Sequence, residues 1–246
     1  MKYLVILAIT AAAVLAASSV VRAEPGKPLR HLVYKLGVTV TTQTEELVMG
    51  ENGEMPTAGS GVAHYTAGML SRGTMTADVM GFTGDDALAV QISEQTDNRK
   101  APPVRVDVTV DGQLRINPDD LVNVTEEEQE LLRLLARKFL SEDGLDAGRW
   151  VHELEQGKAN LHEEYRIMAR QPNGDLTIAL DQRIKVAGAQ PYDTTTHGTI
   201  TYSNSYKVPR SISIDGRTHH EGIQQTETDD TKFSLDLISD SFQPGG

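Results

Sequence analysis

The chain has 246 residues, a formal net charge of −12 at pH 7 and no cysteine. The absence of cysteine excludes disulfide scaffolds, thiolate metal sites and thiol nucleophiles. The acidic balance disfavours nucleic acid as a partner, because binding to phosphates depends on Lys and Arg. It disfavours docking on anionic membranes for the same electrostatic reason.

Residues 1–23 have the pattern of a secretory signal peptide. A positive charge near the N-terminus precedes an apolar stretch from Tyr3 to Ala17, and Val21 and Ala23 occupy the positions where signal peptidase needs small side chains. The alternative is a membrane anchor that stays attached, but the apolar run is shorter than the roughly 20 residues of a spanning helix. We therefore expect cleavage before Glu24, a periplasmic or extracellular protein, and no integral membrane segment after cleavage.

Beyond the expected cleavage site, a hydrophobic period of two dominates the sequence. Between Leu32 and Val40, apolar residues alternate with mainly polar ones, which is the pattern of a strand with one buried face. Similar short segments recur at 75–79, 88–92, 104–110, 161–167, 176–180, 200–202, 212–214 and 233–237. The dipeptides Asp111-Gly112 and Asn173-Gly174 predict tight hairpin turns, the first of them with two residues. The pattern indicates about 11 to 13 antiparallel strands.

One amphipathic helix is expected within this series of strands. Thr125 and Glu128 form a capping box, which places the start of the helix. Gly144 is expected to lie just beyond its end. The apolar face that must be buried comprises Leu131, Leu132, Leu135, Ala136, Phe139 and Leu140.

These elements predict an α+β fold that is predominantly antiparallel β. We expect a large curved sheet or half-barrel of about 11 to 13 strands, with one amphipathic helix packed on its concave side. Residues 24–242 are predicted to form a single β-rich domain, because no linker interrupts the strand pattern. Residues 50–61 form a loop rich in glycine, and the tail at 243–246 is expected to be disordered.

This layout resembles that of the periplasmic lipoprotein carriers, in which an incomplete barrel is lidded by helices and holds acyl chains. The resemblance rests on the export signal, the number of strands and the segment from Thr125 to Leu140 as a lid. It spans most of the mature chain and includes no sequence motif. Those carriers commonly begin with a helix, whereas this chain begins with the strand at Leu32.

The resemblance implies a soluble binding protein whose ligand is a lipid or another apolar molecule. A large curved sheet tends to leave an interior that its own side chains do not fill. We expect the ligand to lie between the sheet and the helix, with Leu131, Leu135, Phe139 and Trp150 lining it. For Trp150 the alternative is a place in the hydrophobic core.

The histidines give no complete catalytic or metal-binding motif. His152 and His162 each precede a glutamate, but the second histidine of a zinc-protease motif is missing after both. The pair His219-His220 could bind a metal only with a third ligand from elsewhere, such as His197, and an exposed polar strand end is the simpler interpretation. We therefore expect no metal, no cofactor and no catalytic residue.

Three functions remain open from the sequence. The first is an exported soluble binding protein that carries a lipid or other apolar ligand. The second is a hydrolase of envelope or extracellular substrates that uses carboxylates or histidines, although the sequence favours a protein that is not an enzyme. The third is an adhesive or assembly protein. The sequence leaves the ligand and the oligomeric state open.

Overall fold

A computed structural model describes residues 27–47, 62–156, 159–188, 191–222 and 225–242. The expected signal peptide, the glycine-rich loop at 50–61 and the expected disordered tail lie outside the described residues.

The described residues form one open, curved sheet of antiparallel strands, as the sequence predicts. The sheet order is β5-β4-β3-β2-β1-β11-β10-β9-β8-β7-β6. Sequential strands are therefore neighbours except β5 and β6, which form the two edges, and the first strand, β1, pairs with the last, β11. The strands are β1 (Arg30–Leu47), β2 (Val62–Phe82), β3 (Leu88–Thr96), β4 (Val104–Val108), β5 (Leu114–Ile116), β6 (Arg149–Gln156), β7 (Ala159–Arg170), β8 (Asp175–Val186), β9 (Tyr192–Ser203), β10 (Val208–Glu221) and β11 (Gln225–Asp240).

The expected helix begins where the sequence places it. In α1 (Glu126–Leu134) the Thr125 hydroxyl accepts a hydrogen bond from the Glu128 N–H at 3.2 Å, and the Thr125 N–H donates to the Glu128 carboxylate at 2.8 Å. A 3-10 helix, η1 (Pro118–Asn123), precedes it. Within the described part of the chain, no helix is long and apolar enough to cross a lipid bilayer.

The prediction that this helix continues to Leu140 was wrong. The helix ends at Leu134, and the Lys138 N–H donates a hydrogen bond to the Val110 carbonyl of the β4–β5 turn at 2.9 Å. A second helix, α2 (Glu142–Ala147), follows and contains Gly144, which therefore does not terminate a helix. The residue that ends α2 is Gly148, at φ 70°.

The two hairpin turns predicted from Asp111-Gly112 and Asn173-Gly174 are present. Both turns connect their strands through three residues, whereas two were expected at Asp111-Gly112. In both turns the glycine lies in the left-handed region, with φ 88° at Gly112 and φ 85° at Gly174. This is the type I turn with a glycine bulge that closes three-residue hairpins.

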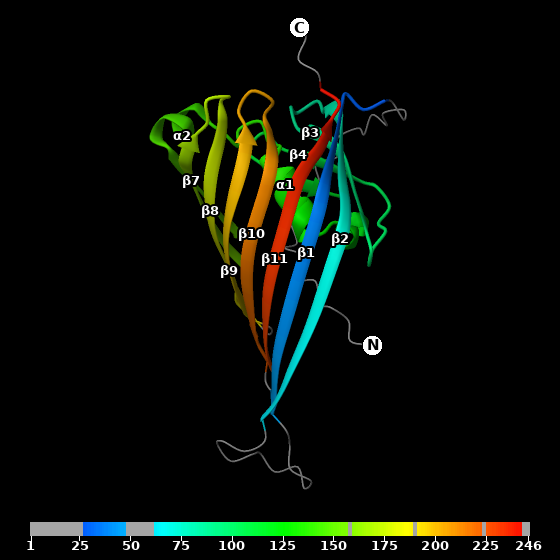
Figure 1. The fold of residues 1–246 in the computed structure, drawn as a ribbon, viewed down its shortest axis with the longest axis vertical. Coiled ribbons are helices and arrows are strands. Elements are labelled where there is room, and N and C mark those ends of the chain that lie inside the picture. Colours follow the sequence, from blue (N-terminus) through cyan, green and yellow to red (C-terminus); the bar gives the residue numbers. More distant parts are fainter. Residues whose placement is uncertain (1–26, 48–61, 157–158, 189–190, 223–224, 243–246) are drawn as a thin grey trace.

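The sheet curves around α1. The helix contacts β3 and β5 on one side of the curve and β10 on the other, and Figure 1 shows the sheet broad around the helix and narrow at its far end. Leu131, Leu132 and Leu134 of α1 are fully buried against the concave face. The core therefore occupies the broad end of the molecule.

Beyond α1 the strands continue, and their concave face becomes polar. Val38 and Phe233 are buried and lie opposite each other on β1 and β11. The next concave pairs, Val40 with Thr231 and Thr42 with Asp229, are only partly buried. The part of the concave face that is buried in the core thus ends at the level of the first turn of α1.

Candidate functional site: a pocket between α1 and the concave face

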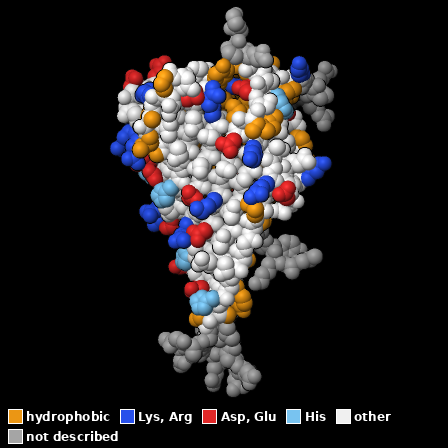
Figure 2. Space-filling view, viewed as in Figure 1, with side chains coloured by type: hydrophobic (Ala, Val, Ile, Leu, Met, Phe, Trp, Pro, Cys, Tyr) orange, Lys and Arg blue, Asp and Glu red, His pale blue; other side chains and the backbone are white. Residues whose placement is uncertain are grey.

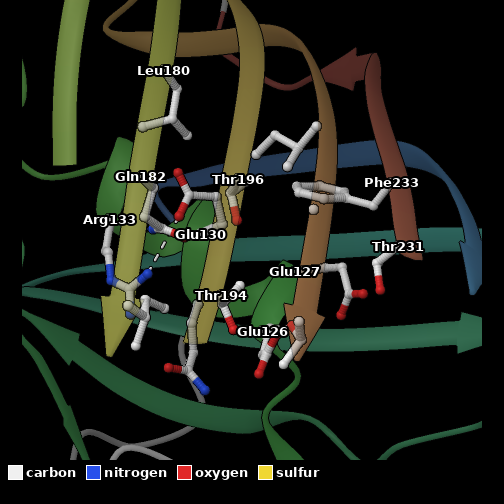
Figure 3. Close-up of a pocket in the computed structure, with 15 residues that line it drawn as sticks. Glu126, Glu127, Glu130, Arg133, Leu180, Gln182, Thr194, Thr196, Thr231 and Phe233 are labelled. Atoms are coloured by element: carbon white, nitrogen blue, oxygen red, sulfur yellow. Dashed lines mark hydrogen bonds and ion pairs between the residues drawn. The ribbon is translucent and has the colours of Figure 1, made fainter. Parts of the chain in front are cut away.

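A pocket of about 110 Å³, partly open to solvent, lies where the concave face leaves the core (Figure 3). One wall is the polar side of α1 and the other is the concave face of β8 to β11. The helix contributes Glu126, Glu127, Gln129, Glu130 and Arg133. The strands contribute Leu180, Gln182, Ile184, Thr194, Thr196, Ile214, Gly216, Thr218, Thr231 and Phe233.

The wall formed by the sheet combines aliphatic, aromatic and threonine side chains. Ile214 and Phe233 are buried, and they form the boundary between the pocket and the core. Gly216 leaves space on β10, because a Cβ atom placed there would meet nothing nearer than the Thr196 hydroxyl oxygen, at 3.5 Å. The missing side chain of Gly216 is one reason that this part of the concave face is hollow.

The wall formed by the helix is acidic. Leu131, Leu132 and Leu134 of α1 are buried in the core, whereas Glu126, Glu127 and Glu130 of the same helix line the pocket. Arg133 is the basic residue of this wall, and its guanidinium lies 3.3 Å from a Glu130 carboxylate oxygen.

Glu130 is the most unusual group in the pocket. It is buried, with 5% of its surface exposed, and its Oε2 atom accepts a hydrogen bond from Arg133. Its Oε1 atom has no hydrogen-bond partner among the described residues. Burial raises the pKa of Glu130 to about 7, and the charge of Glu163 raises it further, whereas the charge and hydrogen bond of Arg133 act in the opposite direction.

Glu163 lies nearby on β7 and is fully enclosed by polar partners. Gln182 donates a hydrogen bond to its Oε1 at 2.7 Å, the Tyr165 hydroxyl donates to its Oε2 at 3.4 Å, and His152 Nδ1 lies 3.6 Å from Oε2. Burial alone would raise the pKa of Glu163, but His152, Arg133 and Gln182 together lower it. The carboxylate in turn raises the pKa of His152.

Two neighbouring carboxyls with opposite pKa shifts are a pattern of general acid and base pairs. A hydrolase would need both groups to reach one substrate. Glu130 lines the pocket, whereas Glu163 is 1% exposed, is held by its own partners and is not part of the lining. Glu163 therefore belongs to a satisfied polar network behind the pocket wall, and no catalytic step follows from this pair of carboxyls.

The four residues predicted to line a ligand, Leu131, Leu135, Phe139 and Trp150, come together in the hydrophobic core. The Phe139 ring packs edge-on against Trp150 and Tyr165, with centroids 5.6 and 5.2 Å apart. None of the four belongs to the lining of the 110 Å³ pocket. Their contact with a ligand stays a prediction.

The candidate histidines lie apart. On β9 and β10, His197 pairs with Asp215, whereas His220 pairs with Tyr192 five residues further along. His197 Nδ1 lies 2.6 Å from Asp181 on the convex face, where histidine, basic and acidic side chains are interspersed (Figure 2). Among the residues that the structure describes, no three potential metal-ligating side chains come together.

A second cavity, of about 470 Å³, lies at the broad rim beside the β7–β8 and β9–β10 turns. It is larger than the pocket under α1, but its charged groups already have partners. The Arg210 guanidinium lies 2.8 Å from the Asp175 carboxylate, to which Asn173 also donates a hydrogen bond at 3.0 Å. The unpartnered oxygen of Glu130 makes the smaller pocket the stronger candidate.

The residues of the pocket wall were not predicted from the sequence. Glu126 and Glu127 fit the favourable charge of a helix N-terminus, which explains them without a pocket. Glu130 lies on the polar side of a helix whose other side is apolar. The signal that remained was Gly216, a glycine inside a strand, which often marks close approach by a ligand or another backbone.

No protein family and no curated protein matches the sequence. Among solved structures, one similar chain belongs to a structure described as lipid–protein interactions in lipovitellin. The TM-score is 0.49 with 11% sequence identity, and the match covers 89% of this chain but 26% of that chain. The chain thus spans about a quarter of the matched protein, and similarity at this level carries no functional argument.

Proposed function

We propose that the chain is an exported binding protein that holds a ligand with an apolar body in the pocket between α1 and the concave face of β8 to β11. The observation that carries the proposal is the wall of the sheet, where Ile184, Ile214 and Phe233 line a hollow that no other part of the described chain fills. Concave, largely apolar hollows with a few polar groups are the usual form of small-molecule sites.

The driving force for binding would be burial of apolar surface. Each Å² of apolar surface removed from water contributes about 25 cal/mol. In the pocket this surface comes from aliphatic and aromatic side chains together with the methyl groups of Thr194, Thr196 and Thr231. A ligand without an apolar part would gain little from this wall.

The size of the pocket limits what it holds in the present conformation. A dry cavity of about 150 Å³ in another protein accommodates benzene, so the volume of about 110 Å³ suits a short alkyl or single-ring group. A longer chain would extend toward the narrow end of the sheet, over partly buried concave residues such as Val186, Tyr192 and His220. A lipid would place one segment in the pocket and the rest along this face.

Export belongs to the same proposal. The signal-peptide pattern of residues 1–23 supports a location outside the cytoplasm, where a soluble binder would meet ligands released from an envelope or from the medium.

Native mass spectrometry of the mature protein, purified without detergent, tests the proposal, followed by organic extraction of the bound fraction. We expect a stoichiometric small molecule with an apolar body. Gly216→Leu should abolish its binding, because a side chain at this position occupies the pocket while its Cβ makes only ordinary contacts.

Gly68→Leu is the matched control. Gly68 lies on β2 opposite Thr41, on the convex face, and a Cβ atom there meets nothing nearer than the Val40 carbonyl oxygen, at 4.0 Å. This variant should keep the ligand. Two results together would refute the function. The mature protein would carry no small molecule, and it would bind alkyl probes no more tightly than the Gly216→Leu variant does.

A further inference from the structure

The two walls of the pocket differ in chemistry. The wall of the sheet is apolar apart from its threonines and Gln182, whereas the helix presents three carboxyl groups and one guanidinium. A ligand seated between them therefore meets an apolar surface on one side and an acidic surface on the other. This asymmetry indicates which polar group an apolar ligand would carry.

Glu130 marks the place where that polar group would bind. Its Oε2 atom is used by Arg133, but its Oε1 atom is buried and lacks a hydrogen-bond donor among the described residues. A buried acceptor without a partner is costly, because it has lost its water and gained nothing in exchange. A donor on the ligand would remove that cost.

The charges around Oε1 select among donors. Glu126 and Glu127 line the pocket on the preceding turn of α1. The single positive charge, on Arg133, is already shared with Glu130 at 3.3 Å. Because negative charge exceeds positive charge, the pocket disfavours carboxylates and phosphates and favours a cation.

We propose that the pocket recognises ligands that carry a protonated amine on an apolar body. The ammonium group donates to Glu130 Oε1 and lies near the carboxylates of Glu126 and Glu127, while the apolar body lies against Ile184, Ile214 and Phe233. This inference rests on the proposed function and names the substrate class of the same site.

Three probes with the same alkyl chain test it: hexylammonium, hexanol and hexanoate. Isothermal titration calorimetry on the full mature protein is carried out at pH 8, above the pKa of Glu130 and below that of an alkylamine, which titrates like a lysine side chain. Hexylammonium should bind about tenfold more tightly than hexanol, because hydrogen bonds to charged groups are the stronger ones. Hexanoate should bind most weakly.

Glu130→Gln should remove the preference for hexylammonium and leave the affinity for hexanol within about twofold. The matched control is Glu128→Gln, because Glu128 is also buried on α1 but does not line the pocket. If Glu130→Gln does not fold, the double variant Glu126→Gln, Glu127→Gln serves instead, since it removes two charges from the wall without touching Arg133. It should lower hexylammonium affinity several-fold and leave hexanol unchanged.

The possible failures are distinguishable. Equal binding of hexylammonium and hexanol, or a preference that survives both sets of acidic substitutions, overturns the inference and leaves the binding function standing. Competition by inorganic cations is a further test. If they displace hexylammonium as effectively as a second alkylamine does, the inference is overturned, because the apolar body would then play no part. If none of the three probes binds, the inference and the proposed function fail together.

Discussion

Gly198 and Ile214 face each other across β9 and β10, and a Cβ atom at Gly198 would lie 2.7 Å from Ile214 Cγ1. The Ile214 side chain therefore occupies the space that a side chain at Gly198 would need. Ile214 also lines the pocket, so this close fit positions part of the binding wall.

Gly198→Ala is accordingly expected to destabilise the fold by about 1–3 kcal/mol, the usual cost of overpacking. Gly216→Ala should be neutral or stabilising by up to about 1 kcal/mol, since its Cβ has room and alanine restricts the unfolded chain. Urea unfolding monitored by circular dichroism measures both. Equal effects at the two glycines would show that Ile214 moves aside without cost.

Glu128 provides a prediction about pH. Burial raises its pKa from 4.5 to about 7, against a hydrogen bond from the Thr125 N–H, and the charged groups around it are Glu94, Arg99 and Glu127. The folded state thus holds a proton that the unfolded state has lost, so stability falls as pH rises from about 4.5 through 7. Glu128→Gln should match the wild type at pH 4 and be more stable at pH 8 by about 1–3 kcal/mol.

Thermal unfolding of both proteins across this pH range checks the prediction at Glu128. The amide oxygen of glutamine can accept the Thr125 N–H in place of the Glu128 carboxylate oxygen, so the capping box is retained. A variant that is less stable at pH 8 would mean that the carboxylate charge, not its acceptor oxygen, stabilises the start of α1.

Arg30 joins the first and last strands. It donates to both carboxylate oxygens of Asp240, at 2.9 and 2.6 Å, and to the Tyr206 carbonyl at 2.8 Å. Burial would raise the pKa of Asp240, but the hydrogen bonds from Arg30 and the Phe242 N–H lower it. The stability from this pair is present above the ordinary carboxyl pKa of about 3.9 and is lost as pH falls through the lowered value.

Arg30→Ala should therefore cost about 1.5–3 kcal/mol at pH 7, as expected for charge-assisted hydrogen bonds, and less below pH 3. The control is Arg217→Ala. Arg217 makes a similar pair with Asp230, but the guanidinium is mostly exposed, and solvent screens exposed pairs so that they contribute little to stability. Chemical denaturation at both pH values gives the comparison, and equal losses at pH 7 would contradict the distinction by burial.

Phe139 tests the core under α1. Its ring contacts three aromatic rings, those of Trp150, Tyr165 and Tyr202, so Phe139→Ala should cost about 3–5 kcal/mol. Differential scanning calorimetry measures the loss. A variant that keeps its stability but loses a co-purified ligand would instead assign Phe139 to ligand contact.

Much of the fold could be predicted from the sequence, because period-two alternation and turn residues act locally. The capping box at Thr125 fixed the start of the helix for the same reason. Its end could not be predicted, since the Lys138 N–H donates to the Val110 carbonyl in a distant turn and not to a carbonyl of the preceding helical turn. Gly144, which was expected just beyond the end of the helix, lies close to the Trp150 side chain, and this is again a tertiary contact.

The strands extend further than their apolar alternation. β1 continues past Val40 through a run of threonines, and β9 begins with residues of the same kind. Threonine favours strands without requiring burial on either face, so the hydrophobic pattern ends where the core ends and not where the strand ends. The pocket lies at this boundary, which is why residue patterns alone did not locate it.

The pairing of β1 with β11 has a consequence for how the chain reaches its native state. These two strands form the centre of the sheet, yet they are the first and last strands of the described chain. The β1–β5 and β6–β10 segments can each form as neighbouring hairpins, but the seam between them closes only after β11 has been synthesised. Such long-range closure slows folding, so we expect the newly made protein to spend a period with two separate half-sheets and no pocket.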